Sequence, residues 1–132
     1  MSEVVSVSGE DFTASANRDG TEIRTWLKGN ADYSAIDALE MLVKRIHADA
    51  QRAPLTEVVV DLRGLEFMNS SCFKSLVSWI TAIQELDAKD RYKVRFLSNP
   101  DLHWQKRSLH TLRCFAVELI TVTEPGSSDA DH

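Results

Sequence analysis

One stretch, residues 58–73, constrains the fold more than any other part of the chain, and it reads VVVDLRGLEFMNSSCF. It opens with a run of β-branched apolar residues, which is typical of a buried strand. After a bend that contains Gly64, apolar residues recur at spacings of three and four and predict one buried helix face. These are Phe73, Leu76, Val77, Ile80 and Ile83. The stretch therefore predicts a strand from Thr56 to Asp61 and a helix from Ser71 to about Asp87.

Two serines, Ser70 and Ser71, stand where the helical spacing begins. Serine is a favoured N-cap residue, because its hydroxyl accepts a hydrogen bond from a free backbone N–H of the first turn. A hydroxyl at a helix N-terminus also lies in a field that favours added negative charge. The residues alone leave two interpretations open: simple capping, or a site of charge-based switching.

The rest of the chain alternates between strand and helix patterns. The predicted elements are strands at Phe12–Asn17 and Thr21–Lys28, a helix at Tyr33–Asp49, a strand at Tyr92–Leu97, a helix at Leu102–Cys114 and a strand at Val117–Val122. The pair Asp19-Gly20 predicts a tight turn, so the first two strands form a hairpin. Strands that alternate with helices require crossovers. The order predicts an α/β fold with a mixed, mainly parallel sheet covered by helices.

The length of 132 residues predicts a single domain, at residues 11–123. Residues 1–10 are predicted to be a flexible N-terminal arm, with an extra edge strand as the alternative. Residues 124–132 have almost no apolar content and are predicted to be a disordered tail.

Composition and charge narrow the class of protein. The net charge of −5 argues against a nucleic-acid surface, which needs a basic stripe. No apolar run approaches the roughly 20 residues of a membrane helix, and the acidic start is unlike a secretory signal. The two cysteines, Cys72 and Cys114, are predicted to be buried, reduced thiols. We therefore expect a cytoplasmic protein.

Three segments resemble the STAS domain, the fold of bacterial anti-sigma-factor antagonists. Leu27–Asp32 is similar to the segment that ends the second strand of that family, and Val60–Leu65 is similar to its central strand and the turn after it. Phe67–Ser71 is similar to its phosphorylation loop, usually Met-Asp-Ser-Ser/Thr-Gly. The resemblance extends from about Asp11 to Val122 and implies a STAS-like single domain.

The resemblance also implies a function. It implies a non-enzymatic regulatory module that binds a serine kinase or anti-sigma-type protein, or another signalling protein, and that releases its partner when phosphorylated. Ser70 matches the phosphorylated serine, with Ser71 as the alternative acceptor. The usual aspartate and glycine of the loop are here Asn69 and Cys72. The alternative is a STAS scaffold or sensor subunit, without phosphorylation, in a larger signalling assembly; self-association is left open.

We expect the partner surface at the N-terminal end of the Ser71–Asp87 helix and the Asn30–Asp32 turn, because ligands of open α/β sheets gather at the carboxyl ends of strands. The Ser71 hydroxyl is expected to face the core side. Trp79 borders the apolar stripe of its helix and is either a partner anchor or a packing residue. The candidate partner-binding residues are Asn30, Asp32, Asp61, Asn69, Ser70, Ser71, Lys74 and Trp79.

Other chemistry finds little support in the sequence. His103, His110 and Cys114 could share one helix face, but a single helix cannot surround a zinc ion. No glycine-rich phosphate loop and no nucleophile-elbow pattern is present. The alternating Arg91, Lys93 and Arg95 are interpreted as the solvent face of a strand. We expect no catalytic residue, no metal and no cofactor.

Overall fold

The computed structural model describes residues 2–124. The predicted disordered tail therefore lies outside the described residues, except for Glu124. The elements, in chain order, are β1 (Ser2–Ser8), β2 (Phe12–Asp19), β3 (Glu22–Ala31), the 3-10 turn η1 (Tyr33–Ala35), α1 (Ile36–Arg52), β4 (Glu57–Met68), α2 (Ser70–Gln84), the 3-10 turn η2 (Ala88–Asp90), β5 (Lys93–Leu97), α3 (His103–Phe115) and β6 (Ile120–Thr123).

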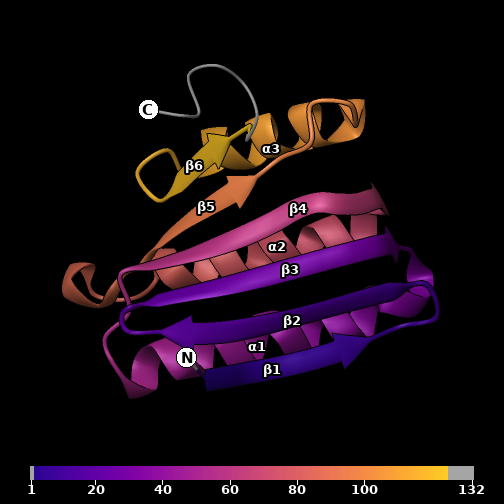
Figure 1. Cartoon of the computed structure of the whole chain (residues 1–132). Helices are drawn as coiled ribbons and strands as arrows, with labels where there is room; N and C mark the ends of the chain where they lie inside the picture. Colours follow the sequence, from indigo (N-terminus) through magenta and orange to yellow (C-terminus); the bar gives the residue numbers. More distant parts are fainter. Residues whose placement is uncertain (1, 125–132) are drawn as a thin grey trace.

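The strands form one six-stranded sheet in the order in which they occur along the chain (Figure 1). β1, β2 and β3 pair antiparallel, whereas β3, β4, β5 and β6 pair parallel. Val58–Asp61 lies in β4, between β3 and β5, as predicted for the central strand. The α/β class and the mixed, mainly parallel sheet are confirmed.

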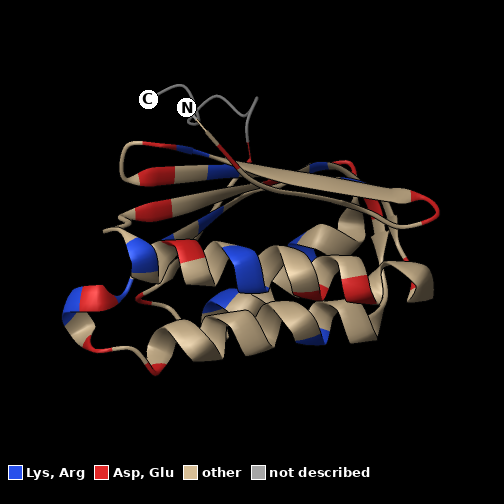
Figure 2. Cartoon of the chain, turned by 90° about the horizontal axis from the view of Figure 1, so that it is seen from below, with Lys and Arg blue, Asp and Glu red and all other residues tan. Residues whose placement is uncertain are grey.

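α1 and α2 lie side by side on the same face of the sheet, as Figures 1 and 2 show. Successive right-handed crossovers that all advance in one direction place their helices on one face. The core lies between this face and the helices; α1 buries Leu39, Leu42, Val43 and Ile46 in it. α3 adds Leu109 and Leu112 to the same cluster. The opposite face has no helix among the described residues, and exposed side chains such as Thr13, Arg24 and Lys28 lie on β2 and β3.

β4 extends well beyond the predicted end at Asp61, as far as Met68. The added length pairs with β3, from Lys28 opposite Gly64 to Ala31 opposite Met68, with two register shifts. Gly64 does not bend the chain out of the sheet; a Cβ at this position would lie 3.3 Å from Cγ of Lys28. The backbone hydrogen bonds offered by β3 keep this segment extended, and a local pattern cannot reveal them.

Two further predictions are corrected. Residues 2–8 are not a flexible arm, because they form the edge strand β1, paired antiparallel with β2. Val5 is buried in the core. Pairing this strand with β2 therefore removes apolar surface from water and stabilises the fold. Cys72 is buried as predicted, but Cys114 is exposed near the end of α3; both thiols are free.

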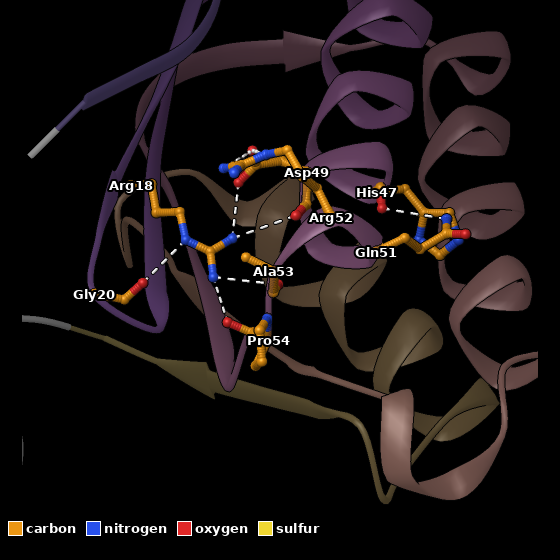
Figure 3. A network of polar contacts seen from close by, with 8 residues as sticks. All are labelled: Arg18, Gly20, His47, Asp49, Gln51, Arg52, Ala53 and Pro54. Atoms are coloured by element: carbon orange, nitrogen blue, oxygen red, sulfur yellow. Dashed lines mark hydrogen bonds and ion pairs between the residues drawn. The ribbon is translucent and has the colours of Figure 1, made fainter.

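Arg18, near the end of β2, ties the hairpin to the C-terminal end of α1 (Figure 3). Its guanidinium donates to Asp49 Oδ2 at 2.8 Å and to the carbonyl oxygens of Gly20, Ala53 and Pro54. Arg18 and Asp49 are only 10% and 13% exposed. Burial acts to raise the pKa of Asp49, but hydrogen bonds from Arg18 and Arg52 outweigh it and hold the pKa below its usual value.

Candidate functional site

The N-terminal end of α2 is the centre of the candidate site. β4 ends at Met68, and the next backbone N–H, that of Asn69, donates to the carbonyl oxygen of Ala31 at 2.9 Å. Asn69 is the N-cap residue, with extended backbone, and Ser70 is the first residue of the helix. The site is therefore built where the carboxyl ends of two parallel strands meet a helix N-terminus.

Asn69, and not a serine, caps the helix. Its Oδ1 atom accepts a hydrogen bond from the backbone N–H of Cys72 at 2.8 Å. Ser70 is exposed, and its hydroxyl has no hydrogen-bond partner within residues 2–124. The prediction of a serine cap is wrong, because the helix begins one residue earlier than predicted, at Ser70, and the cap position therefore falls on Asn69. The Ser70 hydroxyl is therefore left open to solvent.

Ser71 is also exposed, so the expectation that its hydroxyl faces the core side is wrong. Lys74 is exposed as well and forms no ion pair within the described part of the chain. It follows Ser70 by four residues and Ser71 by three, which places all three side chains on neighbouring positions of the helix surface. A cation thus lies within reach of negative charge added to either serine.

The turn after β3 joins this end of α2 directly. The Asp32 side chain caps η1, accepting from the Ser34 backbone N–H at 3.0 Å and from its hydroxyl at 2.7 Å. The Cys72 thiol donates to the carbonyl oxygen of Asp32 at 3.5 Å. Asn30 donates through its side chain to Asp11 Oδ2 at 2.6 Å. The segment Asn30–Asp32, predicted as a turn, consists of the last two residues of β3 and the cap residue of η1, and it forms one surface with the start of α2.

Cys72 stands at the position where the phosphorylation loop of the STAS family usually has glycine. Its side chain is nevertheless not exposed on the protein surface. It is 0% exposed and packs in the core. Burial, together with the charge of Asp32, raises the pKa of the thiol to about 11. The thiol is therefore protonated at neutral pH, and its place is structural.

Trp79 is buried, with 4% of its surface exposed. Its indole N–H donates to the hydroxyl of Tyr92 at 2.8 Å, and the same hydroxyl lies 2.7 Å from Nδ1 of His47. The structure therefore matches the packing alternative for Trp79 and not a protruding anchor. The residue still lines the groove between α1 and α2.

Asp61 does not belong to this surface. It lies in the middle of β4, seven residues before Met68, at a distance on the order of 20 Å by the rise of a strand. Its carboxylate is held by Arg63, with Oδ2 2.7 Å from the guanidinium. Burial acts to raise the pKa of Asp61, but the bonds from Arg63 prevail and lower it. The placement of Asp61 with the other candidate residues is corrected.

Two exposed aromatic residues near the site were not singled out from the sequence. Tyr33, directly after Asp32, is 84% exposed, and Phe67, paired with Asn30, is 47% exposed. Tyr33 lines the same groove as Ser71 and Lys74. A large aromatic residue outside the apolar stripe of its helix is the signal that could have identified Tyr33.

Residues 2–124 show no metal-binding cluster and no membrane-spanning helix. Within residues 2–124, no cluster of three or more His, Cys, Asp or Glu side chains is arranged to hold a metal ion. His110 Nε2 lies 3.6 Å from Cys114 Sγ on exposed helix surface, and His103 does not join them. None of the described helices has the length and apolar character needed to cross a membrane.

No protein-family model matches the sequence, and no curated protein matches it. Solved structures do resemble it. The crystal structure of an anti-sigma factor antagonist from Mycobacterium paratuberculosis aligns with a TM-score of 0.64 at 18% identity, over 94% of this chain and 94% of that chain. The STAS domain of an antisigma-factor antagonist from Rhodobacter sphaeroides gives 0.48 at 19% identity, over 67% and 88%. The anti-sigma factor antagonist SpoIIAA in its unphosphorylated form gives 0.47 at 14% identity, over 88% and 92%.

The first of these alignments covers nearly the whole of both chains, so it compares complete folds. Within residues 2–124, the fold of this chain consists of a mixed six-stranded sheet and three helices. The chain therefore has the STAS fold, that of the anti-sigma-factor antagonists.

Proposed function

We propose that this chain is a non-enzymatic regulatory module that binds a signalling protein through the N-terminal end of α2 and the Asn30–Asp32 turn. The partner is of the serine-kinase or anti-sigma type, and the binding takes place in a bacterial cytoplasm. One observation carries the proposal: the Ser70 hydroxyl is exposed, unpaired within residues 2–124 and set at a helix N-terminus. The fold, shared with an anti-sigma factor antagonist, supports it.

Phosphorylation of Ser70 is the proposed switch. A phosphate would add about −1.5 to −2 charges near neutral pH. The free N–H groups of the first turn, the positive end of the helix dipole and Lys74 would accept this charge locally. The fold would therefore survive the modification.

The partner would not accept it equally well. A partner surface fitted to a neutral hydroxyl would face a buried anion without a counter-charge, at a cost on the order of several kcal/mol. Phosphorylation would therefore act on binding and hardly on stability. Ser71, one residue further into the helix and also exposed, is the alternative acceptor.

The test has two parts. Intact-mass measurement of protein purified from its own cells should show a population heavier by one phosphate, mapped to Ser70. Ser70→Asp should release the native partner, and Ser70→Ala should bind it constitutively. If neither serine carries phosphate and Ser70→Asp binds as tightly as wild type, the switch is excluded. The chain would then be a scaffold or sensor subunit.

A further inference from the structure

A groove of about 740 Å³ runs along the outer side of the α1–α2 pair. Its lining extends from Tyr33 to Gln51 on one wall and from Ser71 to Ala82 on the other. At 1.5 Å per residue, the α2 wall alone is about 17 Å long. A groove of this length and openness fits an elongated occupant better than a compact one.

The α2 wall has the character of an interface core. The residues of α2 that line the groove include Ser71, Ser75, Ser78 and Ala82 at spacings of four, three and four, so small side chains follow one face of the helix. Lys74 is the one charged residue between Ser70 and Gln84, and Figure 2 shows the helix almost free of charge. Depletion of charge marks the centre of protein interfaces. The apolar surface of the groove comes from exposed or partly exposed lining residues, namely Tyr33, Ile36, Ala48 and Ala82.

Charged side chains stand unpaired along the two walls. Lys44 on α1 and Lys74 on α2 are exposed, and neither forms an ion pair or a hydrogen bond within residues 2–124. Glu40 on α1 is also exposed and unpaired in that range. The groove thus offers two free cations and one free anion, in a chain of net charge −5. Acidic groups on an occupant would complement the excess of positive charge.

We propose that this groove binds an acidic amphipathic α-helix of a protein partner. Its apolar face would pack on Tyr33, Ile36 and Ala82. Acidic side chains at its flanks would reach Lys44 and Lys74. Laying an amphipathic helix into an apolar groove is a recurrent mode of peptide recognition. The inference rests on the proposed partner-binding function and extends it, because the groove begins at Ser71, beside Ser70.

The experiment measures binding of synthetic peptides to the full chain by fluorescence anisotropy. The probe is a labelled peptide of about 18 residues, with leucines at helical spacing and glutamates on both flanks. One control peptide has lysines in place of the glutamates, and a second has the same composition in an order that destroys the apolar face. We expect the acidic amphipathic peptide to bind at least about tenfold more tightly than either control, and to weaken with salt.

Matched variants assign the binding to the groove. Ser78→Trp should fill it and weaken the probe at least about tenfold. Thr111→Trp, at an exposed hydroxyl residue of α3 outside the groove, should leave the affinity unchanged. The double variant Lys44→Gln/Lys74→Gln should remove the preference for the acidic over the basic peptide. This second measurement holds even if Ser78→Trp fails to fold, which circular dichroism would reveal.

Three results would overturn the inference: equal affinity for all three peptides, no binding of the probe, or binding that Ser78→Trp leaves intact in a folded protein. Binding of decanoate without binding of the probe would assign the groove to a small amphipathic carboxylate and would also overturn it. None of these measurements involves Ser70, so their failure leaves the proposed switch standing. The proposed switch is tested separately, by the binding of the native partner to the Ser70 variants.

Discussion

The side-chain Oδ1 atom of Asn69 accepts a hydrogen bond from the backbone N–H of Cys72 at 2.8 Å. This contact satisfies one of the free donors of the first turn of α2. Because Asn69 supplies the cap, the neighbouring hydroxyl of Ser70 is not needed to cap the helix. The cap and the candidate switch are thus adjacent but separate residues, and each can be changed without the other.

Replacing Asn69 by alanine should lower the free energy of unfolding by about 1 kcal/mol, because the cap is lost. Asn69→Asp keeps the acceptor and adds a charge that the helix dipole favours, so it should match or exceed the wild type. Denaturant unfolding measures all three proteins. Ser70→Ala is the control and should stay within about 0.5 kcal/mol of wild type. A larger loss for Ser70→Ala than for Asn69→Ala would show that Ser70 is the cap.

Gly29, at the end of β3, should tolerate alanine far less well than Gly20. Both have positive φ angles, of 95° and 65°, and this alone costs a side chain roughly 1–2 kcal/mol. At Gly29 a Cβ would also lie 2.2 Å from the carbonyl oxygen of Asp11, whereas at Gly20 it would meet nothing within 4 Å. Thermal unfolding should show a clearly larger drop in Tm for Gly29→Ala. Equal drops would mean that backbone conformation accounts for both effects.

Tyr92→Phe should destabilise the protein on the order of 2–3 kcal/mol, because it leaves the indole N–H of Trp79 and Nδ1 of His47 without their shared partner. The Tyr92 hydroxyl accepts from Trp79 and also shares a hydrogen bond with Nδ1 of His47, whose direction is set by the tautomer of the imidazole. Urea unfolding at pH 8 measures the loss. A change below about 0.5 kcal/mol would contradict the assigned network.

His47 should make stability fall as the pH drops below about 6.5, its usual value when unfolded. Burial lowers the pKa of His47 in the folded protein, so the unfolded chain binds the proton more readily. Stability is therefore fully present above that pH and declines below it. Unfolding free energies measured from pH 8 to pH 5 should show this slope, and His47→Gln should reduce it. An unchanged slope in the variant would assign the effect to other groups.

Asp49 should contribute stability that is present above about pH 4 and is lost as the pH falls through its lowered folded pKa. Arg18→Met removes one of its two cations and the bonds to Gly20 and Ala53, and should cost roughly 2–3 kcal/mol at pH 7. Asp49→Asn should flatten the dependence of unfolding free energy on pH between 5 and 2. Asp61→Asn should flatten the same profile independently, since Arg63 holds the pKa of Asp61 below its usual value. Identical profiles for Asp49→Asn and wild type would contradict this assignment.

Much of the fold could be predicted from local patterns. The turn at Asp19-Gly20, the central strand through Val58–Asp61 and the apolar stripes of the helices each depend on residues close together in the chain. Side-chain periodicity and turn chemistry are local properties, so the sequence carries them directly. The candidate surface at Asn30–Asp32 and Ser70 followed from the same order of elements.

Contacts between distant segments decided the rest. β4 continues to Met68 because β3 supplies its hydrogen bonds, and this separates Asp61 from Ser70. Residues 2–8 become a strand because β2 offers an edge and the core accepts Val5. Trp79 is buried, where its indole N–H donates to the hydroxyl of Tyr92, thirteen residues away. The sequence by itself determined the three helices and the middle parts of the strands from β2 to β6. The tertiary structure decided where strands end and which side chains are buried, because hydrogen-bond partners and buried area exist only once the segments meet.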